Sequence, residues 1–143
     1  MMRRRRTREA AANAWRRDVG ALLGDAKMAR DVLDNASGGA IDPTRLQMLR
    51  GQVDAVGDRL ARLAATAPDD TARARSTAVE QEFRGYLLAL ESEQLLRESA
   101  AAPSAQAVAD AVATRQAHAD ALNSALTQLE ELTQSAAVTS RHT

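Results

Sequence analysis

Apolar residues recur at alternating three- and four-residue intervals along four successive stretches of the chain, and this spacing constrains the fold more than any other feature. In an α-helix such positions form one continuous stripe, which is buried against other helices. In the first stretch the stripe comprises Ala12, Trp15, Val19, Leu22, Ala26, Ala29, Leu33 and Ala36. In the second it comprises Leu46, Leu49, Val53, Val56, Leu60, Leu63 and Ala67. The spacing therefore predicts long amphipathic helices packed side by side.

The third and fourth stretches follow the same pattern with two departures. The third loses its regular spacing after Leu90, so we expect its stripe to drift toward Leu95 and Leu96. The fourth keeps the three- and four-residue spacing from Ala105 to Ala136 but has Arg115 where an apolar residue is expected. A guanidinium at such a position needs a carboxylate or carbonyl partner, because an unpaired buried charge costs several kcal/mol.

Turn residues separate the stretches. Ser37-Gly38-Gly39 can end a helix, and Asp42-Pro43 can begin the next one. Pro68-Asp69-Asp70 marks the second break, and a weaker one surrounds Pro103. We expect an all-α, up-down-up-down antiparallel four-helix bundle with helices at about 5–36, 43–67, 70–100 and 104–137. An oligomeric coiled coil is the alternative, and a homodimer stays open.

Composition supports this class of fold. Ala accounts for 32 of the 143 residues, while aromatic residues make up only 2%. Such a composition favours helices and argues against a β-sandwich or β-barrel. The absence of cysteine excludes disulfides, thiolate catalysis and cysteine-ligated metals. No stretch is long and apolar enough to span a membrane, and no apolar region of a signal peptide follows the basic start.

The formal net charge of zero conceals an uneven distribution. Residues 1–17 carry a net charge of +6, so residues 18–143 carry −6. We expect an Arg-rich arm at 1–9 that projects past a bundle formed by 10–137, and a frayed tail at 138–143. Clustered arginines attract phosphates and other anions. The predicted anion-binding residues are Arg3, Arg4, Arg5, Arg6, Arg8, Arg16 and Arg17.

An anionic membrane surface or a membrane protein is the favoured target of the arm, since positive charge beside a membrane is typical of the cytoplasmic side. A solvated terminus that has no particular partner is the other interpretation. Nucleic acid is the alternative target. It is disfavoured because the cations of the second and third stretches are interleaved with aspartates, which favours pairing within the molecule. The cations concerned are Arg45, Arg50, Arg59, Arg62, Arg73 and Arg75.

The predicted partners of Arg115 are Glu91 and Glu93, which lie at the matching level of the third helix. The other interpretation is that the aliphatic stem of Arg115 packs in the bundle while its guanidinium reaches water. Gly20 and Gly24 in the first helix, with Gly57 in the second, would allow those two helices to approach closely; local flexibility is the other interpretation.

No catalytic constellation, metal-ligand spacing or phosphate-binding glycine loop is present in the sequence. We therefore expect a non-enzymatic helical interaction module without cofactor or metal, placed in the cytoplasm and at the inner face of the membrane. Such a module would present acidic, Ala-rich helix faces to a protein partner. A regulatory bundle that binds a small apolar ligand between its helices is a further alternative.

Overall fold

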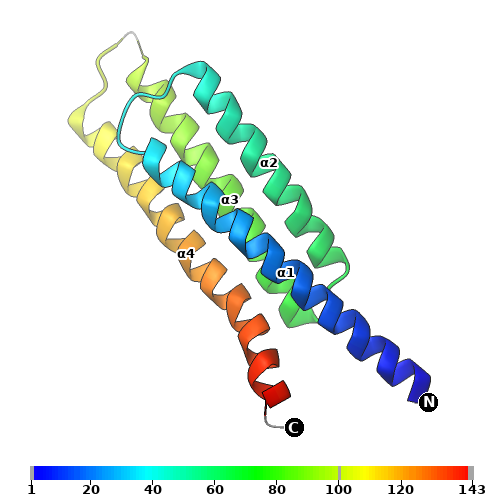
Figure 1. The fold of residues 1–143 in the computed structure, drawn as a ribbon. Helices are drawn as coiled ribbons and strands as arrows, with labels where there is room; N and C mark the ends of the chain where they lie inside the picture. The colour runs from blue at the N-terminus through cyan, green and yellow to red at the C-terminus, as the bar shows by residue number, and fades with distance from the viewer. Residues whose placement is uncertain (1, 100, 142–143) are drawn as a thin grey trace.

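The computed structural model describes residues 2–99 and 101–141, with side chains for 7–99 and 101–134, and contains four α-helices within that part of the chain. They are α1 (Met2–Ala36), α2 (Pro43–Ala65), α3 (Asp70–Arg97) and α4 (Ala105–Arg141). Each helix packs against the next one in the chain, and α1 also packs against α4 (Figure 1). The predicted antiparallel four-helix bundle is confirmed.

The ends of the helices follow from local chemistry. Gly38 has a φ of 91°, a left-handed conformation that stops α1. The Asp42 carboxylate then accepts a hydrogen bond from the Arg45 amide at 2.9 Å and caps α2 at its first residue, Pro43. Asp69 caps α3 in the same way, accepting from the Ala72 amide at 2.8 Å.

Three predicted helix ends differ from the structure. Helix α2 ends at Ala65 rather than at 67, since Pro68 disfavours helical geometry in the residue before it. Helix α3 ends at Arg97 rather than at 100. Helix α4 continues to Arg141, so most of the predicted tail is helical, while residues 142–143 lie outside the described part.

The core lies along the predicted apolar stripes of α1 and α2, which are called seams below. A chain reversal near residue 39 places Trp15 and Leu63 at the same level by residue count, and a hydrogen bond of 2.8 Å joins the indole Nε1 to the Leu63 carbonyl. Trp15 is only 5% exposed, so its ring belongs to the core. The stripe of α4 is less deeply buried at the N-terminal end of that helix, where Ala105 is exposed and Val108 and Val112 are half-buried.

The seam of α3 differs from the expected one. Leu95 is 70% exposed, and the predicted drift toward Leu95 and Leu96 does not occur. Instead the stripe stays in strict three- and four-residue steps, with Ser76 and Glu93 at two of its positions. Polar side chains at these positions hid the regularity of the pattern. The buried stripe comprises Ala72, Ser76, Val79, Phe83, Tyr86, Leu90 and Glu93.

The glycines do not bring α1 and α2 close together. A Cβ added at Gly20 or Gly24 would meet nothing within 4 Å, so the proposed close approach there is wrong. Gly57 instead faces α3, where a Cβ would lie 2.6 Å from Nη2 of Arg84.

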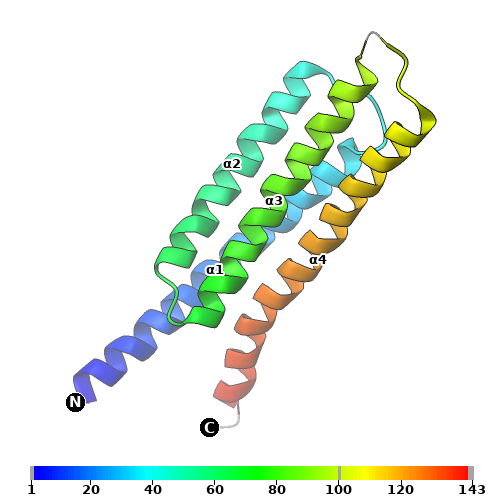
Figure 2. The ribbon, with the colours of Figure 1, turned by 180° about the vertical axis from the view of Figure 1, so that it is seen from behind.

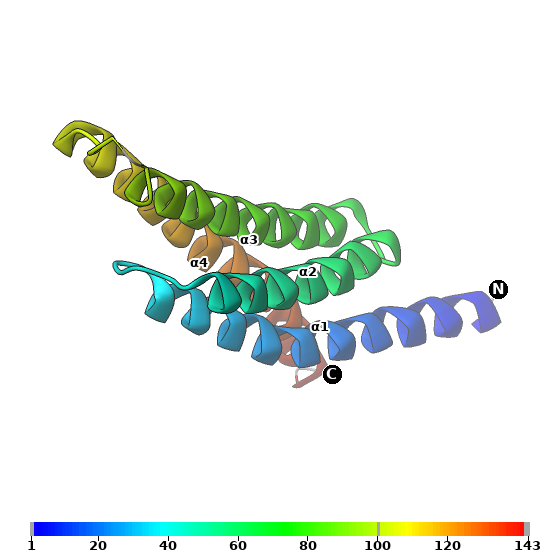
Figure 3. The same ribbon diagram turned by 90° about the horizontal axis from the view of Figure 1, so that it is seen from above.

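Both chain ends lie at one pole of the bundle. The N-terminal turns of α1 project past the connection between α2 and α3, and they diverge from α4 (Figures 1 and 2). Seen from above, the N-terminal turns of α1 extend away from the other helices (Figure 3). The Arg-rich segment therefore continues α1 as helix beyond the bundle.

Candidate functional site

The first candidate site is the basic pole, which we define as the N-terminal arginines of α1 and the bundle surface beside them. Arg8 and Arg17 are exposed, and half-buried Arg16 donates a hydrogen bond of 3.1 Å to the side chain of Asn13. The backbone of residues 3–6 is helical. The predicted side-chain sites Arg3, Arg4, Arg5 and Arg6 lie outside the described side chains.

Ion pairs neutralise most cations of the bundle body. They connect neighbouring helices: Arg59 of α2 reaches Asp25 of α1 at 2.6 Å, and Lys27 of α1 reaches Glu130 of α4 at 2.9 Å. Most of these arginines pair with a carboxylate on another helix and not with the aspartates that lie beside them in the sequence. Further pairs between helices are Arg50 with Glu91, Arg75 with Glu131, and Arg84 with Asp54 and Asp58.

Arg45 and Arg62 are exceptions, and sequence reasoning missed them. We expected both to be paired within the molecule, yet neither forms an ion pair with any carboxylate among the described residues. Arg45 lies in the first turn of α2, and Arg62 lies in its last turn. Arg62 precedes Leu63, which is bonded to Trp15, so Arg62 lies level with the first bundle turn of α1. It lines an open hollow of about 340 Å³ together with Asp18, Leu22 and Thr66. The bundle thus adds an exposed cation from α2 to the basic pole.

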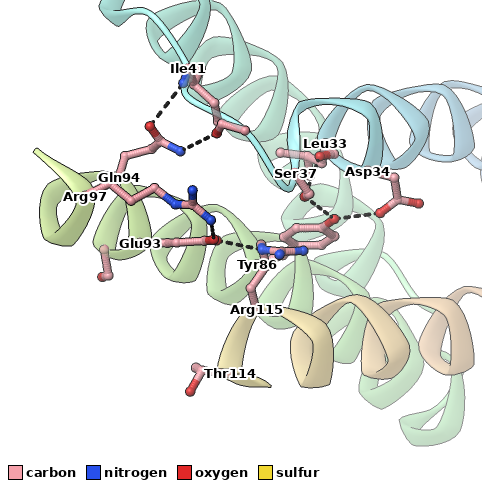
Figure 4. Close-up of polar contacts among 12 residues, drawn as sticks. Leu33, Asp34, Ser37, Ile41, Tyr86, Glu93, Gln94, Arg97, Thr114 and Arg115 are labelled. Atoms are coloured by element: carbon pink, nitrogen blue, oxygen red, sulfur yellow. Dashed lines mark hydrogen bonds and ion pairs between the residues drawn. The ribbon is translucent and has the colours of Figure 1, made fainter. Parts of the chain in front are cut away.

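The second candidate site is a buried polar cluster near the opposite pole (Figure 4). The structure pairs Arg115 with Glu93, at 2.6 Å between Nε and Oε2. Arg97, one turn along α3, donates to the other carboxylate oxygen at 2.8 Å. Glu93 is 1% exposed and Arg115 8%, so the pair is withdrawn from water. Glu91, the other expected partner of Arg115, is absent from this cluster and pairs with Arg50 at 3.3 Å.

Electrostatics explain the charge state of Glu93. Burial by itself would raise the pKa of this carboxyl, because it disfavours the charged form. Hydrogen bonds from Arg97 and Arg115 outweigh that effect, and the pKa of Glu93 lies below its ordinary value. A carboxylate held between two guanidinium groups is a weak proton acceptor.

Tyr86 extends the cluster toward α1. Its hydroxyl donates to the Asp34 carboxylate at 2.6 Å and lies 3.0 Å from the Ser37 hydroxyl (Figure 4). Ser37 in turn donates to the Leu33 carbonyl at 2.8 Å. Burial, together with the hydrogen bond to Asp34, raises the pKa of Tyr86 to about 12. Tyr86 therefore stays neutral and anchors the C-terminal end of α1 to α3.

Gln94 holds the connection between α1 and α2. Its side-chain oxygen accepts from the Ile41 amide at 3.0 Å, and its nitrogen donates to the Gly39 carbonyl at 2.9 Å. One buried amide thus satisfies two backbone groups of a segment that has no regular structure of its own. Sequence reasoning missed this residue, since a glutamine at the edge of a helix carries no recognisable signal.

The polar cluster fits a structural role. Among the described side chains, every buried nitrogen and oxygen atom has a hydrogen-bond partner. A fully satisfied polar network fixes the register of neighbouring helices, because any slip leaves buried charges unpaired. Within the described part of the chain, no group of three or more histidine or acidic side chains could hold a metal ion.

Two apolar hollows lie on the outside of the helix pairs. One, of about 260 Å³, lies between α1 and α2 and is lined by Met28, Val32 and Ala55. The other, of about 340 Å³, lies between α3 and α4 beside Leu88 and His118. The expected protein partner and the alternative of a small apolar ligand both stay predictions.

No helix in the described part of the chain has a segment apolar enough for a membrane span. Comparison with known proteins finds no matching family, no similar curated protein and no matching solved structure. The two candidate sites therefore have to be interpreted from their own chemistry.

Proposed function

We propose that this protein is a non-enzymatic helical interaction module that docks through its basic pole on an anionic membrane surface, at the cytoplasmic face. The observation that carries the proposal is the uneven balance of charge in space. Residues 1–17 have a net charge of +6, and α1 carries their N-terminal part beyond the bundle. The body, at −6, uses its own carboxylates to neutralise most of its cations.

The close spacing of arginines in the arm favours the binding of an external anion. In a helix, like charges three or four residues apart repel one another, and the sequence places Arg3 and Arg6, Arg5 and Arg8, and Arg4 and Arg8 at such spacings. Each repulsion costs a few tenths of a kcal/mol, and a surface of negative headgroups would remove it. The positive charge has the form of one projecting helix, which can lie against a surface while the bundle stays clear of it.

A membrane is favoured over nucleic acid because the positive charge does not continue over the bundle. A protein that follows a nucleic-acid backbone needs a basic stripe or groove, with aromatic side chains where bases stack. Here the cations of α2 and α3 mostly pair with carboxylates, and Trp15, Phe83 and Tyr86 are all buried.

The expected affinity follows from the charge count. Each arginine near an anionic membrane contributes about 1 kcal/mol, and the attraction weakens as salt shortens the Debye length. Removing four arginines would therefore cost about 4 kcal/mol, which is close to a thousand-fold in affinity. An effect of this size is readily measured.

Sedimentation with vesicles tests the proposal. The wild-type protein should sediment with vesicles containing phosphatidylserine and not with neutral vesicles. A variant with alanine at Arg3, Arg4, Arg5 and Arg6 should lose this binding. The matched control removes the same charge from the body, with alanine at Lys27, Arg30, Arg45 and Arg50, and should still bind.

Two results would contradict the proposal. If the arm variant and the body variant bound the vesicles equally, the arm would not be the docking element. If the wild-type protein ignored anionic vesicles but bound DNA or RNA in a gel-shift titration, with affinity falling steeply as salt rises, the nucleic-acid alternative would replace the membrane.

A further inference from the structure

Two hydroxyl side chains have at least two arginines among the three residues that precede them. Thr7 follows Arg4, Arg5 and Arg6, and Ser76 follows Arg73 and Arg75. Protein kinases with an acidic substrate cleft select hydroxyls in such surroundings, because opposite charges attract the segment and orient it. The sequence alone does not distinguish the two candidates.

The structure separates them. Ser76 is 0% exposed, lies in the core seam of α3 and donates its hydroxyl proton to the Ala72 carbonyl at 2.9 Å. Thr7 is exposed, and so are residues 8–11 that follow it. A kinase binds its substrate in an extended conformation, so α1 has to unwind locally around Thr7. Unwinding there removes helical hydrogen bonds but exposes no core residue, whereas presenting Ser76 requires the bundle to unfold.

We propose that Thr7 is a phosphorylation site for a protein kinase that selects basic segments, and that its phosphate releases the arm from the membrane. The second part rests on the proposed function. In the transfer, Thr7 Oγ1 attacks the γ-phosphorus of a nucleoside triphosphate, and a new O–P bond forms. The bond to the β–γ bridging oxygen breaks, the nucleoside diphosphate leaves with that electron pair, and the hydroxyl proton passes to the catalytic aspartate of the kinase.

The phosphate acts on the arm through charge. It adds about −1.5 to −2 to a segment that holds five arginines in positions 3–8. In the helix, Thr7 follows Arg3 by four residues and Arg4 by three, a spacing at which opposite charges attract. The phosphate therefore competes with lipid headgroups for the same guanidinium groups. Affinity for anionic vesicles should fall about 10- to 30-fold.

The test combines labelling with vesicle binding. The folded protein is incubated with ATP and a kinase that selects basic sites, and the modified residue is located by mass spectrometry. Thr7 should be labelled in the folded protein, while Ser76 should be labelled only after denaturation. Thr7→Ala should abolish labelling of the folded protein. Thr44→Glu, which adds a negative charge on the exposed first turn of α2, is the control for a charge placed away from the arm.

The possible outcomes are distinct. Labelling of Thr7 with a fall in vesicle binding supports both parts, provided that Thr44→Glu binds like the wild type. Labelling without a fall overturns the switch and leaves the proposed function standing. Absence of label on Thr7, while denatured Ser76 is labelled, overturns the modification site. If the unmodified protein binds no vesicles, the proposed function and the switch fail together, and the labelling alone decides the modification site.

Discussion

Replacing Glu93 with leucine should destabilise the bundle more than most single substitutions. Its carboxylate is 1% exposed and accepts hydrogen bonds from Arg115 at 2.6 Å and Arg97 at 2.8 Å. The side chain of Arg97 is 35% exposed and can turn toward water, but Arg115 is 8% exposed and would be left without its partner. An uncompensated buried charge costs about 3–5 kcal/mol. That is a large share of the roughly 5–15 kcal/mol by which a domain is stable.

A double-mutant cycle isolates the ion pair. Arg115→Met leaves Glu93 bonded to Arg97, so we expect a smaller loss of about 1–3 kcal/mol. Combining Glu93→Leu with Arg115→Met removes both charges and retains apolar volume in the seam. Such replacements are commonly neutral or stabilising, so the double variant should lie within about 1 kcal/mol of the wild type.

Urea unfolding followed by far-ultraviolet circular dichroism measures these differences, with an unchanged m-value as the check that the variants unfold in the same way. The pKa of Glu93 is depressed in the folded state, so the stabilisation is complete above the ordinary carboxyl range and disappears as the pH falls through the lower folded value. The wild type should therefore lose stability on acidification more steeply than Glu93→Leu. A single-variant cost below about 1 kcal/mol, with additive effects in the double variant, would refute the desolvated ion pair.

Two further predictions concern Tyr86 and the glycines. Spectrophotometric titration should show Tyr86 ionising near pH 12 in the folded protein, and stability should fall as the pH rises above the ordinary tyrosine range; ionisation at the ordinary pKa of 10.0 would contradict its burial. Gly24→Ala should raise the free energy of unfolding by about 1 kcal/mol, since the position is helical, exposed and free of neighbours within 4 Å. Gly85→Ala should give a smaller gain, because a Cβ there would lie 2.7 Å from the His118 ring, which would have to shift from its position 3.1 Å from Glu82; equal gains at the two sites in chemical denaturation would contradict this reasoning.

Much of the fold could be predicted because each signal is local. The spacing of apolar residues defines a helix face, and Asp42-Pro43 begins a helix through its own backbone and side-chain chemistry. Even the position of Trp15 and Leu63 at the same height along the bundle followed from counting residues on either side of the first turn. The α3 seam could not be completed, because Ser76 and Glu93 are polar and become core residues only through partners on their own and neighbouring helices.

The same limit applies to the sites. Glu91 and Glu93 are equivalent partners for Arg115 by level alone, yet two residues along a helix correspond to about 200° of rotation, so only one of them can face α4. Arg62 and Arg59 look alike in sequence, but of the two only Arg59 is paired with a carboxylate of α1.

The sequence by itself determined that the chain forms four long helices and that its positive charge gathers at one end, since apolar spacing and charge order are properties of neighbouring residues. Only the tertiary structure decided which charges are neutralised, which carboxylate is buried, and which of two arginine-preceded hydroxyls stays exposed. The physical reason is that pairing and burial depend on the rotation of each helix about its axis. That rotation is set by the packing of all four helices together.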